Sequence, residues 1–254
     1  MAKLGTEPYK GVRDFYPEDM AVQNYIFNTW RKVADSFGYV EYSASPLEPT
    51  EIYTEKSGVE IVNEQTFTFT DRGDRSVTLR PEMTPTLARM VAARRRSLKF
   101  PLRWFSIPNL FRYERPQRGR RREHWQLNCD LLGIAGIEGD KEMISLVYAI
   151  MKEFGAKDSD FEIRINNADT DIFKEIGPNF VFDPSLARGQ AYYTGMVFEI
   201  FDTDSENNRA LAGGGRYDNL LELFEVNLIP AIGFGMGDIT LRDFLETHKL
   251  GPYA

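Results

Sequence analysis

Apolar residues near the start of the chain repeat with the period of a helix. They recur at spacings of four and three: Val22, Ile26, Trp30, Val33 and Phe37. This spacing places them on one helical face. It predicts a helix over residues 17–37, which Pro17 begins and Gly38 ends.

The rest of the chain alternates between strand and helix patterns. Strands are predicted over residues 39–44, 65–70, 76–80, 103–107, 125–132, 161–165, 196–201, 209–213 and 231–236. Helices are predicted over residues 84–96, 140–154 and 238–246. Strands outnumber helices, several neighbouring strands form hairpins, and no regular βαβ alternation is present. The pattern therefore predicts an α+β fold with a mainly antiparallel sheet flanked by helices.

Composition narrows the class of protein. The 254 residues suit one large domain or two small ones, and the share of charged residues, 27%, is that of a globular protein. The single cysteine, Cys129, excludes an internal disulfide and lies in an apolar stretch, where we expect a buried thiol. No membrane-length apolar run or secretory leader is present, so a cytoplasmic protein with no membrane partner is expected.

Positive charge is concentrated although the net charge is −7. Arginines cluster at residues 94–96 and again within residues 112–122. An acidic chain with a local arginine cluster suggests a polyphosphate or RNA contact at one place.

The second cluster lies in FRYERPQRGRRREHWQLNCDLLG, residues 111–133. Arginine binds phosphate through two parallel hydrogen bonds, so a loop with several arginines between two strands can close over a polyphosphate. A solvated basic loop is the alternative, and this segment alone does not decide between the two.

Four other segments carry candidate chemistry. In TLRPEMTPTLAR, residues 78–89, a stiff turn holds Glu82 and Thr84 where they could bind an ammonium group; alternatively they cap a helix. ARGQAYYTGMVFE, LAGGGRYDNL and AIGFGMGDITLRDFL, residues 187–199, 211–220 and 231–245, are rich in glycine. Glycine lets a ligand approach the backbone, but it also serves close packing between strands.

Together, the segments resemble the catalytic domain of histidyl-tRNA synthetases, which are class II aminoacyl-tRNA synthetases. KGVRDFYPEDM, followed by the helix and strand to Pro46, looks like motif 1. Residues 111–133 look like motif 2, and residues 231–245 look like motif 3. RGQAYYTG and AGGGRYD resemble the two histidine-specific motifs. The resemblance implies a class II synthetase-like fold, ATP and Mg²⁺ as cofactors, and a homodimer built through motif 1.

The resemblance also implies roles for single residues. Arg112 and Arg188 would be catalytic, at the α-phosphate of ATP. The histidine-binding residues would be Glu82, Thr84, Gln126, Asp130, Tyr192, Tyr193, Gly213, Gly214 and Tyr217. The ATP-binding residues would be Arg112, Glu114, Arg120, His124 and Gly235. No residue is assigned to a metal.

Three residue changes set this chain apart from the family pattern. Thr240 stands where motif 3 usually carries a phosphate-binding arginine, and Arg242, two residues on, should point elsewhere on a helix. Gln190 and Ala191 replace an apolar residue and an aspartate in the first histidine motif. His124 stands where phenylalanine is common.

Domain organisation also departs from the family. We expect residues 1–254 to form one catalytic domain, with the usual insertion domain reduced to a connection near residues 166–186. The C-terminal anticodon-binding domain would be absent, in a trimmed core or a naturally minimal version. Binding to the acceptor end of tRNA(His) should then be weak.

The leading functional hypothesis is a histidine--tRNA ligase core that forms histidyl-adenylate from histidine and ATP and transfers histidine to tRNA(His). The alternative is a non-catalytic, histidine-binding regulatory subunit of ATP phosphoribosyltransferase, favoured by Ala191 and Thr240 but not by the retained arginines. A third reading, a general RNA-binding module, leaves the glycine-rich segments unexplained.

Overall fold

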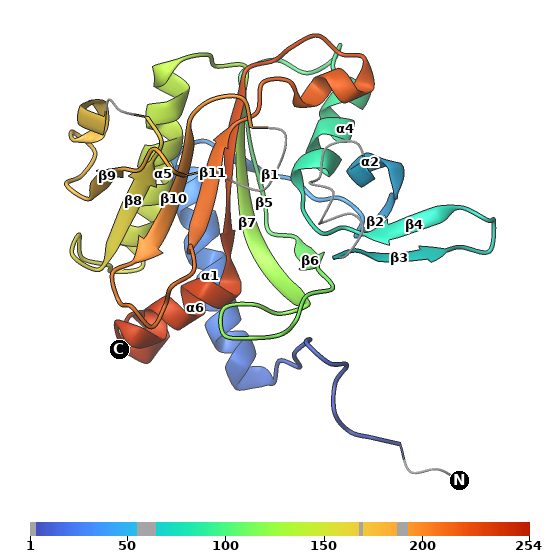
Figure 1. Cartoon of the computed structure of the whole chain (residues 1–254), viewed down its shortest axis with the longest axis horizontal. Helices are drawn as coiled ribbons and strands as arrows, with labels where there is room; N and C mark the ends of the chain where they lie inside the picture. Colours follow the sequence, from blue (N-terminus) through green and yellow to red (C-terminus); the bar gives the residue numbers. More distant parts are fainter. Residues whose placement is uncertain (1–3, 55–64, 168–169, 187–192) are drawn as a thin grey trace.

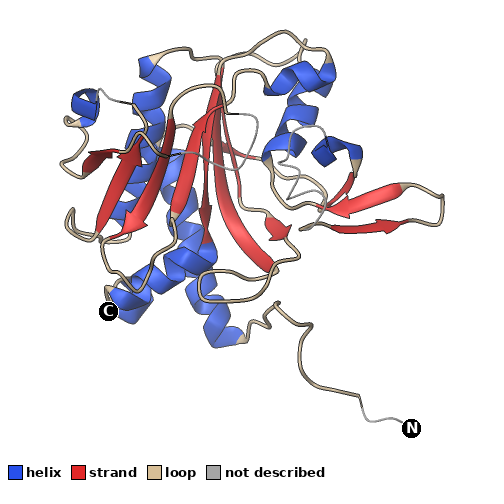
Figure 2. Ribbon diagram, in the orientation of Figure 1, coloured by secondary structure: helices blue, strands red, loops and turns tan. Residues whose placement is uncertain are grey.

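The computed structural model describes residues 4–54, 65–167, 170–186 and 193–254, which form two sheets with surrounding helices (Figure 1). The large sheet crosses the body of the molecule, and the small sheet projects to one side (Figure 2). The site lies on the large sheet, so the two faces of that sheet decide where each candidate residue points.

The large sheet contains most of the strands. They are β1 (Val40–Glu41), β5 (Leu102–Ser106), β6 (Asn109–Phe111), β7 (Glu123–Leu132), β8 (Phe161–Ile165), β9 (Phe180–Phe182), β10 (Val197–Asp202), β11 (Ala212–Arg216) and β12 (Ala231–Gly237). Their order is β1-β5-β7-β12-β11-β10-β8-β9, and β6 pairs with the start of β7. Among the described strands only the pairs β1–β5 and β8–β9 are parallel. The prediction of an α+β fold with a mainly antiparallel sheet is confirmed.

The two longest helices, α1 (Pro17–Ser36) and α5 (Ile137–Glu153), cover one face of this sheet, whereas α4 (Thr84–Arg94) packs against Leu102 and Leu132 on the other face. The other α-helices are α2 (Glu51–Thr54) and α6 (Asp238–Thr247), and short 3₁₀ turns are η1 (Thr170–Phe173), η2 (Leu220–Phe224) and η3 (Gly251–Tyr253). Helices α1 and α5 lie together behind the sheet (Figure 1). Ile26 and Trp30 of α1 and Val147 of α5 are fully buried in the main core between them and the strands. Their burial stabilises the layer because each removes a large apolar side chain from water.

Strand β7 shows how the sheet separates core from site. Leu127, Cys129 and Leu131 are fully buried in the main core, whereas the residues between them point to the opposite face. Alternate residues of a strand face opposite sides of a sheet. Gln126, Asn128 and Asp130 therefore lie on the face that the helices α1 and α5 leave uncovered.

The small sheet joins β2 (Leu47–Pro49), β4 (Ser76–Leu79) and β3 (Phe67–Thr70), in that order. Its pairing register puts all its apolar side chains on one face: Leu47, Pro49, Phe67, Phe69, Val77 and Leu79. Leu47 and Phe69 are 46% and 47% exposed, while Glu48 and Thr78 on the other face are buried. The polar face turns inward, where Arg89 of α4 donates two hydrogen bonds to the Glu48 carboxylate at 2.7 and 3.0 Å.

Several elements differ from the sequence prediction. Strand β11 starts at Ala212 rather than at residue 209, and α5 starts at Ile137 rather than at residue 140. Gly136, with φ of 71°, precedes α5 and allows this earlier start. The three-residue strands β2, β6 and β9 were not predicted, because so few residues show no alternation.

Candidate active site

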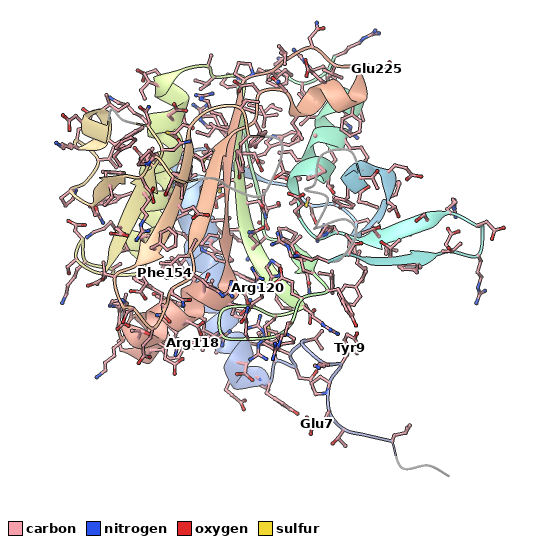
Figure 3. The ribbon with its side chains drawn as sticks, in the orientation of Figure 1. Glu7, Tyr9, Arg118, Arg120, Phe154 and Glu225 are labelled. Atoms are coloured by element: carbon pink, nitrogen blue, oxygen red, sulfur yellow. The ribbon has the colours of Figure 1, made fainter. Side chains whose placement is uncertain are left out.

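A cavity of about 390 Å³ lies on the uncovered face of the large sheet. Its lining comes from the loop between β6 and β7, from β7 itself, from the segment β10 to β12, and from the start of α6: Arg112, Glu114, Gly119, Arg120, Arg121, His124, Gln126, Glu199, Phe201, Asn208, Arg209, Ala210, Leu211, Ala212, Gly213, Gly235, Gly237, Ile239 and Thr240. Arg120 marks its position in the arginine-rich loop (Figure 3). Four guanidinium groups at one hollow make it suited to a polyanion.

A second, smaller hollow adjoins this cavity. It is lined by Glu82, Thr84, Arg112, Gln126, Asn128, Asp130, Tyr193, Gly213, Tyr217, Gly233, Phe234 and Gly235. Arg112, Gln126, Gly213 and Gly235 line both hollows. Four arginines line the larger hollow, whereas carboxylates and tyrosines line the smaller one. The two hollows therefore suit two different kinds of ligand group, and these groups would meet at Arg112.

Arg112 is held at this junction by the backbone around it. Its Nε donates to the carbonyl oxygen of Pro81 at 2.8 Å, and its own backbone N–H donates to Arg122 at 2.8 Å. The Pro81 contact ties the arginine-rich loop to the turn that carries Glu82. The guanidinium is therefore fixed in place before a ligand arrives, which lowers the ordering cost of binding.

Asp130 lines the smaller hollow and is buried. The hydroxyl of Tyr217 donates to its Oδ1, while its Oδ2 is buried without a hydrogen-bond partner among the described residues. Burial raises the pKa of Asp130 to about 7, and the Tyr217 hydrogen bond opposes that rise. A buried carboxylate oxygen that lacks a donor suits the N–H of a ligand such as an imidazole.

Glycines form the floor between these polar side chains. A Cβ on Gly233 would lie 2.5 Å from Oδ1 of Asp130, and one on Gly235 would lie 2.5 Å from Nε2 of Gln126. Both glycines face the site because they pair with β7 residues that do so. Any side chain here would displace the groups that we expect to bind histidine.

His124 lines the larger hollow and is uncharged. Burial, and then the positive charges of Arg112 and Arg13, lower the pKa of its imidazole to about 3. A neutral aromatic ring is a surface on which a nucleobase can stack.

Glu114 and Arg120 form an ion pair within the same hollow. Arg120 Nε lies 2.5 Å from Oε2 of Glu114, whose side chain is almost entirely buried. The pair places a half-exposed guanidinium over the cavity and keeps a carboxylate beside it. Both residues line the larger hollow, and their role in binding ATP stays a prediction.

Not every predicted residue lines the two hollows. Gly214 pairs with Phe234 and lies on the core side of the sheet, whereas its neighbours Gly213 and Gly215 lie on the site face. Gly214 therefore does not face the smaller hollow. Arg188 and Tyr192 lie outside the described residues, as do Gln190 and Ala191. Arg242 donates to the Gln23 side chain at 2.7 Å and points away from the cavity, as predicted from its place on the helix.

Some lining residues were not predicted. Asn128 shares its face of β7 with Gln126 and Asp130, and the alternation of that strand could have identified it. Glu199 of β10 faces the larger hollow because it pairs with Gly213. Arg121, Asn208 and Arg209 lie in loops, whose path the sequence pattern does not predict.

The described residues form neither a membrane span nor a metal-binding cluster. No described helix has both the length and the apolar character needed to cross a membrane. Within the same part of the chain, no group of three or more His, Cys, Asp or Glu residues is arranged to hold a metal ion.

Sequence comparison identifies the relatives of this chain. The Histidyl-tRNA synthetase family model matches residues 11–177 and 166–238. The histidine--tRNA ligase of Leptospira biflexa is 40% identical, in an alignment that covers 98% of this chain and 76% of the relative. The histidine--tRNA ligase of Thermoplasma volcanium is 36% identical, with 98% and 77% covered.

Solved structures share the fold. Apo histidyl-tRNA synthetase of S. aureus superimposes with a TM-score of 0.80 at 27% identity, covering 99% of this chain and 72% of that one. An ATP phosphoribosyltransferase regulatory subunit/histidyl-tRNA synthetase from Bacillus halodurans gives a TM-score of 0.81 at 21% identity, with 96% and 84% covered, which shows likeness of fold. The matched family model, the identity to curated relatives and the shared architecture together show that this chain belongs to the histidyl-tRNA synthetase family.

Proposed function

We propose that the protein activates histidine with ATP to form histidyl-adenylate and then transfers histidine to tRNA(His). The observation that carries this proposal is the meeting of two chemically different hollows at Arg112. A ligand carboxylate in the smaller hollow and a polyphosphate in the larger one would meet beside the same guanidinium.

The reaction joins two anions, and the protein's main task is to hold them together. A histidine carboxylate oxygen attacks the α-phosphorus of ATP, a new P–O bond forms, and the bond to the departing pyrophosphate breaks. Arg112 would offset the repulsion between the carboxylate and the phosphate and would stabilise the charge that develops. Arg188, which lies outside the described residues, stays our proposal for a second guanidinium at this phosphate.

The smaller hollow would select histidine. Asp130 offers its unpartnered carboxylate oxygen to the imidazole, beside Tyr217 and Tyr193. Glu82, Thr84 and Gln126 line the same hollow and would bind the α-amino group. A buried carboxylate favours imidazole over apolar side chains of similar size, because an apolar ligand would leave it without a partner.

The larger hollow would hold ATP, with adenine stacked on His124 and the terminal phosphates near Arg120. Its carboxylates, Glu114 and Glu199, fit the usual way in which Mg²⁺ binds, through one or two carboxylates together with substrate phosphates. Bound Mg²⁺ would neutralise phosphate charge.

Thr240 favours one alternative, a histidine-binding regulatory subunit of ATP phosphoribosyltransferase. Thr240 lines the cavity and brings no positive charge to it. A regulator that only binds histidine has no use, however, for the arginines of the larger hollow.

Histidine-dependent exchange of pyrophosphate into ATP tests the proposal. The parent protein should catalyse exchange, and Arg112→Ala should reduce it by about a hundredfold or more, the usual cost of losing a group that stabilises transition-state charge. Arg75→Ala, which removes the same charge from an exposed turn, should exchange like the parent. Absence of exchange in the parent, with histidine binding intact, would support the regulatory alternative.

We also propose a homodimer and a reduced insertion. The exposed apolar face of the small sheet is a surface that a second copy could cover. The match to the family model divides at residues 166–177, and the Leptospira alignment spans 333 positions against 254 residues here. Both support residues 166–186 as a short substitute for an insertion domain, and binding of tRNA(His) would then be weak.

A further inference from the structure

Arg209 lines the larger hollow, the proposed ATP site. It lies in a part of the chain that none of the sequence motifs covers. It lies in the turn between β10 and β11 and lines the cavity together with Gly119 and Thr240. A Cβ built on Gly119 would lie 2.8 Å from Cδ of Arg209 and 3.4 Å from Cγ2 of Thr240. The Arg209 side chain therefore passes over Gly119 and lies near Thr240, the position at which the family usually carries the motif 3 arginine.

Gly119 is suited to this crossing. Its φ of 69° lies in the left-handed region, and any side chain there would collide with the Arg209 stem. The glycine of the arginine-rich loop thus lets an arginine from another segment enter the cavity.

The charges around Arg209 suit an anionic ligand. Burial lowers the pKa of the Arg209 guanidinium, and the neighbouring charge of Arg120 lowers it further, while Glu114 opposes both. Arg209 forms no hydrogen bond or ion pair with the residues that the structure describes, whereas Glu114 is already paired with Arg120. Four guanidinium groups and two carboxylates, Glu114 and Glu199, line the cavity, which leaves positive charge for a ligand to neutralise.

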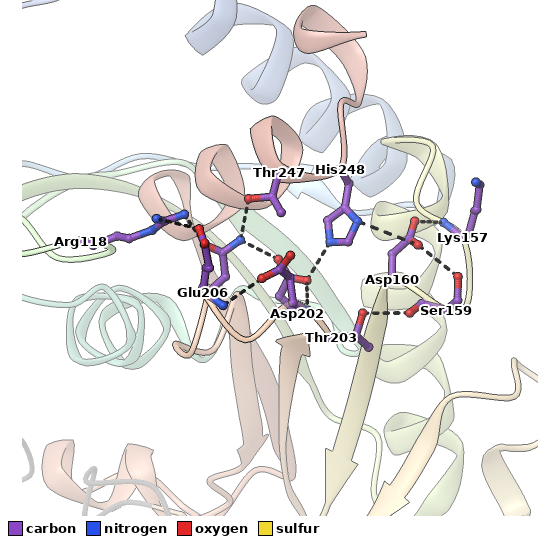
Figure 4. A network of polar contacts seen from close by, with 11 residues as sticks. Arg118, Lys157, Ser159, Asp160, Asp202, Thr203, Glu206, Thr247 and His248 are labelled. Carbon is purple, nitrogen blue, oxygen red and sulfur yellow. Dashed lines mark hydrogen bonds and ion pairs between the residues drawn. The ribbon is translucent and has the colours of Figure 1, made fainter.

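The turn that carries Arg209 is anchored by a buried carboxylate (Figure 4). Asp202, whose side chain is fully buried, accepts hydrogen bonds from Asn207 Nδ2 and from His248 Nε2, each at 2.7 Å. The same Asn207 nitrogen lies 3.0 Å from Thr247 Oγ1 at the end of α6. The turn is therefore fixed to α6, the helix of motif 3.

A second contact fixes this turn to the arginine-rich loop. Arg118 donates to the Asn207 side chain at 3.0 Å and contacts Glu206 at 3.4 Å (Figure 4). The loop with Gly119 and Arg120 and the turn with Arg209 are thus held in one arrangement. A guanidinium placed in this way loses little freedom when it binds phosphate.

We infer that Arg209 binds the terminal phosphates of ATP and supplies the positive charge that Thr240 lacks. This inference rests on the proposed function for the identity of the ligand. Arg209 and Arg120 come from two different segments of the chain and would both contact the terminal phosphates. His124 would contact the adenosine, and Arg112 would contact the α-phosphate.

Calorimetric binding of Mg·ATP and of AMP tests this role, since AMP lacks the terminal phosphates. Arg209→Ala should weaken ATP binding by about tenfold or more, the usual loss for a charge-assisted hydrogen bond, and should leave AMP binding within about twofold. Arg209→Gln keeps most of the stem without the charge and should lose ATP affinity to a similar extent. Arg75→Ala should bind both nucleotides like the parent.

Several results would overturn the inference: unchanged ATP affinity in Arg209→Ala, equal loss of ATP and AMP, or parent-like binding by Arg209→Gln. A parent that binds no ATP would overturn both this inference and the proposed function. A parent that binds ATP through Arg209 but shows no histidine-dependent exchange would refute adenylation alone.

Discussion

Asp130, which we propose binds histidine, also destabilises the fold when it is ionised. Burial raises the pKa of its carboxyl group from 3.8 to about 7. Between these pH values the folded protein retains a proton that the unfolded chain releases, so the free energy of unfolding falls as pH rises. One pKa unit corresponds to about 1.4 kcal/mol, so ionised Asp130 destabilises the ligand-free fold by on the order of 4 kcal/mol above pH 7.

Asp130→Asn should therefore raise the melting temperature by several degrees at pH 8 and change it little at pH 4, where Asp130 is neutral. Histidine affinity should fall in the same variant, because an amide brings no charge to the imidazole. Thermal unfolding at both pH values measures the first effect. Asp71→Asn, the same change in an exposed turn, should give no rise, and a melting temperature of Asp130→Asn that is equally changed at both pH values would contradict the argument.

His124 should act as a flat, uncharged surface. With a pKa near 3 it stays neutral between pH 6 and pH 8, so its ring should add no pH dependence to ATP binding in that range. Base stacking is worth ~1–3 kcal/mol, so His124→Ala should raise the KM for ATP roughly tenfold. His124→Phe should keep it within about twofold; a tenfold rise in this variant would show that a ring nitrogen is needed.

Sequence patterns identified some site residues well and others poorly. Arg112, Gln126 and Asp130 lie on or beside a long strand within a recognisable motif, so both their motif and their alternation were informative. Arg209 lies in a turn, and only the folded path of residues 203–208 brings it to Gly119. The run of three glycines on β11 did not reveal which of them face the site, since that depends on register.

At the level of elements, the start of α6 is the main junction of the fold. The fully buried Asp238 carboxylate accepts hydrogen bonds from Arg13 at 2.7 Å, Gln23 at 3.2 Å and the backbone N–H of Trp125 at 2.9 Å. One side chain thereby joins the N-terminal segment, α1, β7 and α6.

Asp238→Ala should lower the free energy of unfolding by about 3 kcal/mol, because it leaves a guanidinium and a backbone N–H without their buried partner. Urea unfolding followed by circular dichroism measures this change. Glu246→Ala, on an exposed position of the same helix, should stay within about 0.5 kcal/mol of the parent. A similarly small effect of Asp238→Ala would show that the junction contributes little.

Long elements were predictable and short ones were not. The apolar period of α1 and the alternation of β8 each extend over enough residues to be recognised. Strand β9 has three residues and pairs in parallel with β8, without a hairpin turn between them, so no local sequence pattern predicts it. The apolar face of the small sheet became apparent only when the register of three strands was known.

At the scale of the whole molecule, that face predicts association. Phe69→Asp places a charge on its exposed apolar side and should weaken the dimer by at least tenfold, since burying an unpaired carboxylate is costly. Sedimentation velocity over a range of micromolar concentrations measures the shift. Thr70→Asp, on the opposite face of the same strand, should leave the dimer intact.

A parent protein that stays monomeric at these concentrations would refute the dimer. A dimer that Phe69→Asp leaves unchanged would place the interface on another surface.

The shared wall between the two hollows has a thermodynamic consequence. Arg112, Gln126, Gly213 and Gly235 line both, so the proposed amino-acid side and the proposed nucleotide side adjoin each other. A single molecule that fills both sides forfeits its translational and rotational freedom once, whereas two separate molecules forfeit it twice. In the reaction that we propose, the mixed anhydride should consequently be retained far more tightly than either precursor, which would keep this reactive species bound until an acceptor takes it.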